Sequence, residues 1–163
     1  MEFTAHVEKH IELALDPVDL FDALDDHARL SGHMAETSWM MGGGRMRLEL
    51  DERQGRAVGS LMKVEGSAFG LRLSLAERVT ERVPPKRKVW ETCGTTDLVV
   101  IGDYRMGFDI AGRDGGSHLT IWVDFARSPK HPLLSHLLGR SYARWCVDQM
   151  LGSAKALVRE RSV

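Results

Sequence analysis

Two glutamates in the segment AERVTERVPPKRKVWET, residues 76–92, are the side chains best placed to do chemistry. The segment predicts two strands that fold back on each other at Pro84-Pro85. Glu77 and Glu91 then fall on an otherwise apolar face of this hairpin. The apolar residues of that face are Leu75, Val79, Val89 and Cys93. If Val79 pairs with Val89, the two acids lie opposite each other. A register shift of two keeps them diagonal neighbours, and a shift of one separates them.

Opposed carboxylates suit general acid/base catalysis. Two negative charges repel each other across a strand pair and burial adds a further penalty, so one acid is expected to hold a proton. Tyr104 falls on the same set of inward positions and would donate a hydrogen bond to a developing oxyanion on a carbonyl substrate. Glu77, Glu91 and Tyr104 are therefore the candidate catalytic residues. In the alternative, the hairpin extends past the rest of the fold into water, where nearby basic residues balance the acids: Arg78, Arg82, Lys86, Arg87 and Lys88.

The pattern of apolar residues predicts the elements that position this hairpin. Alternate apolar positions at 3–13 predict a strand, Asp16-Pro17 begins a short helix, and a second short helix covers about 26–30. Six further strands follow, joined by tight turns that make them antiparallel hairpins: 45–50, 57–66, 71–80, 87–93, 104–111 and 117–125. The connection at 94–102 is either a lid over a cavity or an extension of a strand.

A long helix is predicted at 132–159. At about 100° per residue, one face of this helix is apolar but built largely from small residues. That face comprises Gly139, Ala143, Cys146, Val147, Met150, Ala154 and Leu157, and the opposite face carries Arg144, Asp148, Lys155 and Arg159. Such a helix can lie across a sheet without filling the space beneath it.

The order of these elements resembles the START-like (SRPBCC) superfamily, which includes Bet v 1-like allergens, lipid-transfer START domains and polyketide cyclase/dehydrase-like proteins. Two segments carry the resemblance: HVEKHIELALDPVDLFDALDDHARL, where a strand runs through Asp-Pro into a helix bearing Phe21, and LLGRSYARWCVDQMLGSAKALV. The resemblance covers essentially the whole chain and implies one domain over 1–163. The implied fold is the α+β helix-grip fold, a seven-stranded curved antiparallel sheet wrapped around a long C-terminal helix, with two short helices after the first strand.

The resemblance also implies a cavity between the sheet and the long helix for a small hydrophobic or amphipathic molecule. Strand parity and the helix face give the residues expected to bind that ligand: Met62, Val64, Leu73, Leu75, Met106, Phe108, Ile110, Tyr142, Cys146 and Met150. Met46, Leu48, Leu50, Leu71 and the apolar residues of 119–125 share the inward face. In the alternative, the same residues pack a solid core. Trp90 and Trp122 fall on the outward set, so this part of the convex surface is either covered or binds a partner.

Composition limits the remaining function classes. A formal net charge of −1 argues against nucleic acid as a partner, and no apolar run is long enough to predict an integral membrane segment. Cys93 and Cys146 have no metal or redox spacing and are expected to be small buried hydrophobes in a reducing, cytoplasmic compartment. The seven histidines are expected at the surface or at helix caps, and neither a metal nor a cofactor is predicted.

Three functions fit these observations. The first is binding of a lipid, a polyketide or a quinone-like molecule, which needs only shape and one or two polar anchors. The second is an enzyme of the polyketide cyclase/dehydratase type that uses acids in the same cavity. The third is a ribosome- or complex-associated regulator that docks a protein partner through the outward tryptophans and the basic tip of the hairpin.

Overall fold

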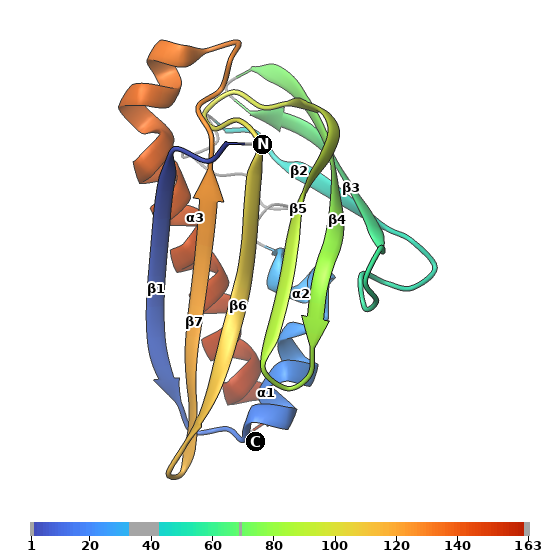
Figure 1. Ribbon diagram of the computed structural model, residues 1–163, viewed down its shortest axis with the longest axis vertical. Coiled ribbons are helices and arrows are strands. Elements are labelled where there is room, and N and C mark those ends of the chain that lie inside the picture. The colour runs from blue at the N-terminus through green and yellow to red at the C-terminus, as the bar shows by residue number, and fades with distance from the viewer. Residues whose placement is uncertain (1, 33–42, 69, 162–163) are drawn as a thin grey trace.

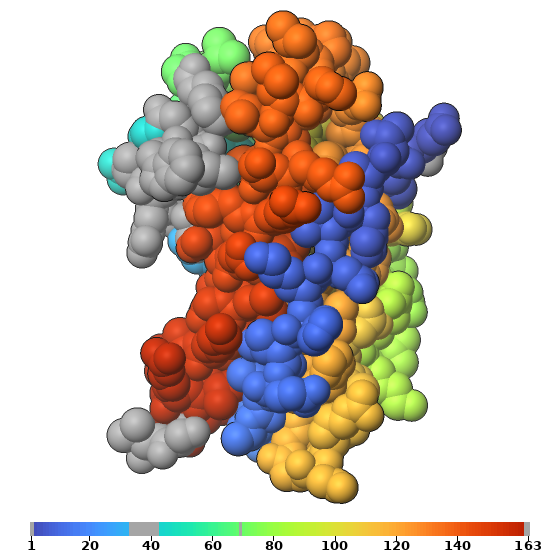
Figure 2. Space-filling view, turned by 90° about the vertical axis from the view of Figure 1, so that its left-hand side faces the viewer, coloured from blue at the N-terminus to red at the C-terminus, as the bar shows by residue number. Residues whose placement is uncertain are grey.

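A single sheet of seven antiparallel strands, in the order β1-β7-β6-β5-β4-β3-β2, forms the body of the molecule (Figure 1). The computed structural model describes residues 2–32, 43–68 and 70–161. The strands are β1 (Ala5–Leu13), β2 (Met46–Leu50), β3 (Leu61–Ala68), β4 (Leu71–Val83), β5 (Arg87–Asp97), β6 (Tyr104–Arg113) and β7 (Gly116–Phe125). The chain returns from the last strand into α3 (Pro132–Arg161), which crosses the sheet and packs against β1 and β7 (Figure 2). This is the helix-grip fold predicted from the sequence.

Two short helices connect β1 to the rest of the sheet: α1 (Pro17–Leu24) and α2 (His27–Leu30). Asp16 begins α1 because its carboxylate accepts hydrogen bonds from the backbone N–H groups of Val18 and Asp19 at 2.8 and 3.2 Å. Asp26 caps α2 in the same way through the N–H of Arg29. Both helices bury their apolar side chains against the sheet and α3, and these include Leu20, Phe21, Leu24 and Leu30.

The small residues of α3 face the sheet as predicted. Gly139, Ala143, Val147, Met150, Ala154 and Leu157 are buried, and Arg144, Asp148, Lys155 and Arg159 are exposed. From the sheet, most of the predicted inward residues are buried as well. Leu48 and Leu50 are half-buried, and Leu71 is 43% exposed because it starts β4 at the end of the sheet.

Two connections differ from the sequence prediction. The third strand begins at Leu61 rather than at residue 57, because the preceding residues form a turn around Asp51. The carboxylate of Asp51 accepts hydrogen bonds from the N–H groups of Arg53, Gly55 and Leu61. Of the two alternatives for 94–102, strand extension applies to the first part, since β5 continues to Asp97. The following Val99, Val100 and Ile101 are buried in the core.

Candidate functional site

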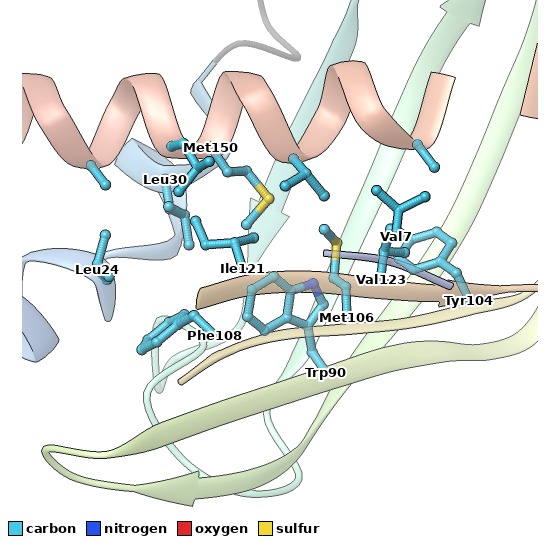
Figure 3. Packing of buried hydrophobic residues seen from close by; sticks show 14 of the residues in the cluster. Val7, Leu24, Leu30, Trp90, Tyr104, Met106, Phe108, Ile121, Val123 and Met150 are labelled. Carbon is cyan, nitrogen blue, oxygen red and sulfur yellow. The ribbon is translucent and has the colours of Figure 1, made fainter. Parts of the chain in front are cut away.

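A cavity of about 60 Å³ lies between the sheet and α3. Side chains from β2 to β7, from α3 and from the connection after β5 line it: Ser31, Met46, Val64, Leu75, Glu77, Trp90, Leu98, Ile101, Tyr104, Met106, Val123, Tyr142, Ala143, Cys146 and Met150. Figure 3 shows Met150 reaching down from α3 toward Trp90 and Met106 on the sheet. The walls are mostly apolar, and the polar lining residues are Ser31, Glu77, Tyr104, Tyr142 and Cys146.

A β-bulge between Val79 and Glu81 decides which hairpin residues face the cavity. The bulge leaves Thr80 without a partner residue in the register, so Val79 pairs with Trp90 rather than with Val89. Of the registers considered for this hairpin, the structure has the one-residue shift that separates Glu77 from Glu91. Glu77 pairs with Thr92, whereas Glu91 pairs with Arg78 and Arg105 on the other face of the sheet.

The same one-residue shift corrects the prediction for Trp90. This side chain is 1% exposed and lines the cavity, whereas it was expected on the outward set. Trp122 does lie on the outward face, but Arg87 and Arg105 stack over its ring and its Nε1 donates to Asp109 at 2.8 Å. Its exposed fraction is 7%, so neither tryptophan is open to a protein partner.

Glu77 is the centre of a buried polar group inside the apolar cavity. Its side chain is 3% exposed, which rules out the alternative in which this acid projects into water. The Tyr104 hydroxyl donates a hydrogen bond to Glu77 Oε1. On the other side, His27 Nε2 lies 3.7 Å from Glu77 Oε2, which is too long for a hydrogen bond. Within the described residues, Glu77 Oε2 and both ring nitrogens of His27 have no hydrogen-bond partner.

His27 does not itself line the cavity but contacts two residues that do. Its ring meets the Trp90 ring edge-on, with centroids 4.8 Å apart. The expectation that the histidines lie at the surface or at caps is wrong for His27, which begins α2 but is 1% exposed, and His33 lies outside the described residues. The sequence holds one signal for the burial of His27. It lies three residues from both Leu24 and Leu30, which places the three side chains on a similar side of a helix.

The electrostatics of the cavity keep its hydroxyl and thiol groups protonated. Burial, and then the charge and hydrogen bond of Glu77, raise the pKa of Tyr104 well above its usual range. Burial also raises the pKa of Tyr142, and it raises the pKa of the Cys146 thiol to about 12 despite the hydrogen bond between these two residues. Tyr104 is therefore a hydrogen-bond donor at neutral pH, and Cys146 is not a thiolate nucleophile.

The residues expected to bind a ligand divide into two groups. Val64, Leu75, Met106, Tyr142, Cys146 and Met150 line the cavity. Met62, Leu73, Phe108 and Ile110 are buried elsewhere in the core. Sequence reasoning missed Ser31, Leu98 and Ile101, which come from connections where strand parity says nothing.

A second buried charged cluster lies beside the first. Lys88 is fully buried and its Nζ donates to Asp25 Oδ1 at 2.9 Å and to the Asp25 carbonyl at 3.3 Å. Arg82 binds the same carboxylate through Nε and Nη2. Burial raises the pKa of Asp25, but the hydrogen bonds and charges of Arg82 and Lys88 outweigh it and lower the pKa. Burial lowers the pKa of Lys88, which shares its single carboxylate with Arg82.

A curved sheet that grips a C-terminal helix around an apolar cavity with one polar end defines a protein of the helix-grip class. The chain belongs to the family described as polyketide cyclase / dehydrase and lipid transport, whose profile matches residues 4–159. This confirms the superfamily inferred from the sequence. No curated protein matches the chain.

Solved structures share the fold at low sequence identity. A Thermus thermophilus protein aligns with a TM-score of 0.72 at 13% identity, covering 98% of this chain and 100% of its own. The Zhui aromatase/cyclase from a Streptomyces species gives a TM-score of 0.71 at 13% identity, covering 98% of this chain and 96% of its own. A Thalictrum norcoclaurine synthase point mutant in complex with a transition-state analogue gives 0.69 at 12% identity, covering 100% and 99%. These similarities show the fold, and the site must be judged from its own residues.

Proposed function

We propose that this protein binds a small hydrophobic or amphipathic molecule between the sheet and α3, as a carrier, sensor or sequestering protein. A lipid, a polyketide or a quinone-like molecule fits this description. Its apolar body would lie against Val64, Leu75 and Met106, and its polar group would meet Glu77. A cytoplasmic location belongs to the same proposal, since both Cys93 and Cys146 are free thiols.

One observation carries the proposal: the free Oε2 of Glu77 in an apolar cavity. Buried polar atoms are hydrogen-bonded in the great majority of cases. An unsatisfied one costs about 1–3 kcal/mol, and more when it is charged. A ligand hydroxyl or amide that donates to Glu77 Oε2 removes this cost. The unpaired oxygen therefore favours a ligand that carries a hydrogen-bond donor over a purely apolar one.

The size of the cavity adds a condition. Sites for drug-sized ligands enclose about 300–1,000 Å³, whereas this cavity measures about 60 Å³. A lipid- or polyketide-sized ligand therefore requires α3 to move away from the sheet. Gly139 and Ala143 place little side-chain volume at that contact, so few interdigitated side chains resist the movement.

Native mass spectrometry of gently purified protein tests the proposal. We expect a co-purified small molecule in the wild type and its loss in Ala143→Val, because Ala143 lines the cavity and two added methyl groups occupy it. Ala156→Val is the matched control, since Ala156 is exposed on the same helix. An empty wild-type protein, or equal occupancy in both variants, would contradict binding in this cavity.

The second candidate function is acid/base catalysis of the cyclase or dehydratase type. The observation that favours it is the contact between Glu77 and a protonated Tyr104 hydroxyl, with His27 near the other carboxylate oxygen. Glu77 would take a proton from the substrate and Tyr104 would stabilise the developing oxyanion. Glu91 has no part in this chemistry, because it faces away from the cavity. Incubating the released molecule with wild type and with Glu77→Gln separates the readings: turnover that depends on Glu77 indicates an enzyme, and an unchanged molecule indicates a binding protein.

A further inference from the structure

The first turns of α3 expose three leucines, whereas the later turns bury their large apolar side chains. Leu133 is 72% exposed, Leu137 is 67% exposed and Leu138 is 40% exposed. By contrast, the later turns bury Val147, Met150, Leu151 and Leu157. In Figure 2 these first turns, drawn in orange, form the upper end of the molecule. A hydrophobic group of this kind at a projecting helix end is typical of an interaction surface.

The segment that carries these leucines is basic. The segment RSPKHPLLSHLLGRSYAR, residues 127–144, contains no aspartate or glutamate, although the chain as a whole has 23 acidic residues. It carries four permanent cations: Arg127, Lys130, Arg140 and Arg144. All four are exposed, and Lys130 pairs with Asp97 at 2.7 Å. The surface around the leucines is therefore locally cationic in a protein whose formal net charge is −1.

Two of these leucines, Leu133 and Leu137, form a single stripe with Arg140 and Arg144. Positions 133, 137, 140 and 144 fall within an arc of about 60° on a helix of 100° per residue. The leucines stand at the projecting end and the arginines follow one to two turns behind. Exposed apolar side chains with long cationic side chains next to them suit a helix that lies in a lipid interface, where the leucines enter the acyl region and the arginines reach phosphates.

A groove beside this stripe has the same character. It has a volume of about 240 Å³ and lies between α3 and the strand ends, lined by Thr4, Ala5, Phe125, Arg127, Ser135, His136 and Arg140. No acid is among its lining residues, and Arg127 and Arg140 supply two cations. Planar guanidinium groups bind phosphate oxygens well. The groove therefore fits the headgroup of an anionic lipid.

We propose that the face formed by Leu133, Leu137, Arg140, Arg144 and the adjoining groove docks on an anionic lipid bilayer. Docking is peripheral, since no helix of the described residues is long and apolar enough to cross a membrane. A second copy of the chain is the less suitable occupant, because a symmetric contact through this face would bring like charges together. Tyr142, Ala143 and Cys146 follow directly on α3 and line the cavity, so the docked face adjoins it.

Vesicle co-sedimentation tests this proposal. We expect the wild type to bind phosphatidylcholine vesicles that contain phosphatidylglycerol, to bind pure phosphatidylcholine much more weakly, and to dissociate as salt is raised. Leu133→Ser/Leu137→Ser should lower the partition coefficient about tenfold or more. Arg140→Gln/Arg144→Gln should lower it about fivefold for each cation removed.

Matched variants separate this face from general surface effects. Val18→Ser/Val58→Ser removes two side chains of similar exposure on other elements, and Lys155→Gln/Arg159→Gln removes two exposed cations from the far half of α3. Both should bind vesicles as the wild type does, and so should Ala143→Val, whose cavity is filled. Wild type that fails to bind anionic vesicles at low salt would overturn the proposal. Binding that survives Leu133→Ser/Leu137→Ser, or a dimer that this variant dissociates, would do so as well.

Discussion

Two buried charged clusters lie side by side in this protein and differ in how completely their polar atoms are paired. The Asp25 cluster, which comprises Asp25, Arg82 and Lys88, satisfies its carboxylate from both sides. The Glu77 cluster, which comprises Glu77, Tyr104 and His27, satisfies only one carboxylate oxygen. The Asp25 cluster joins β4 and β5, and the Glu77 cluster joins β4 and β6, to the junction of α1 and α2, where Asp25 and His27 are only two residues apart.

The difference shows which cluster holds the fold and which is free to bind. Removing one partner of a buried ion pair is strongly destabilising, because it leaves an uncompensated charge. A half-paired carboxylate costs stability until something donates to it. The Asp25 cluster therefore fixes α1 and α2 against the hairpin. The Glu77 cluster contains an unpaired oxygen that lowers stability, and a ligand that donates a hydrogen bond to this oxygen would remove the cost.

The largest effect is expected from Asp25→Asn. Lys88 is fully buried, so losing the carboxylate leaves its ammonium group without a countercharge and should lower the free energy of unfolding by about 3–5 kcal/mol. Urea unfolding at neutral pH measures this loss. Asp19→Asn is the control, because Asp19 is exposed and its ion pair with Arg161 at 3.6 Å should contribute less than about 1 kcal/mol.

The stability lost in Asp25→Asn should depend on pH. The pKa of Asp25 is lowered from its ordinary value of 3.8, so its stabilising contribution is present above that value and is lost as the pH falls through the folded-state pKa. The difference in unfolding free energy between wild type and Asp25→Asn should therefore stay constant at neutral pH and narrow below 3.8. A constant difference down to the acid transition would mean that Asp25 does not act through its charge.

Tyr104→Phe should have an intermediate effect. It removes the hydrogen bond that the Tyr104 hydroxyl donates to Glu77 and leaves a buried carboxylate, at a cost of about 1–3 kcal/mol in unfolding free energy. Tyr142→Phe is the matched control in the same cavity, because its partner is the thiol of Cys146, a weak hydrogen-bonding group. Equal losses of unfolding free energy in the two variants would show that the hydrogen bond from Tyr104 to Glu77 stabilises the fold no more than the contact between Tyr142 and Cys146.

Glu77→Gln should have the smallest effect on stability. The substitution removes a buried charge with an unsatisfied oxygen and keeps an acceptor for Tyr104, so the unfolding free energy should stay within about 1 kcal/mol of the wild type. This contrasts with Asp25→Asn, which is the same acid-to-amide change at a similar depth. Urea unfolding of ligand-free protein measures both changes. Comparable losses of unfolding free energy in Glu77→Gln and Asp25→Asn would contradict the proposed difference between the two clusters.

The sequence predicted the fold well, because helix-grip elements follow from apolar periodicity and turn residues. Asp16-Pro17, the alternation in the strands and the small-residue face of α3 each predicted an element that the structure contains. These signals are local, because the polarity of each residue indicates whether its side chain is buried or exposed.

The site was harder to predict because it depends on register. A single bulge at Thr80 places Trp90 on the inward face and Glu91 on the outward face. Threonine is a common strand residue, so the sequence at this position does not indicate a bulge. The alternative that placed Lys88 in an exposed basic tip is wrong, since Lys88 is fully buried against Asp25. No local pattern indicates this pair, because its two residues are 63 positions apart in the sequence. His27 was missed for the same reason: its contact with Glu77 joins distant segments that only the folded chain brings together.

Glu77 and Glu91 offer the most direct test of the central claim, because both are acids of the β4–β5 hairpin and, of the two, Glu77 alone lines the cavity. The measurement is native mass spectrometry of Glu77→Gln and Glu91→Gln, purified in the same way as the wild type. We predict that Glu91→Gln retains the co-purified molecule at the wild-type level and that Glu77→Gln loses it about tenfold or more, the equivalent of one charged hydrogen bond. Equal retention in both variants, or loss in Glu91→Gln, would contradict the account.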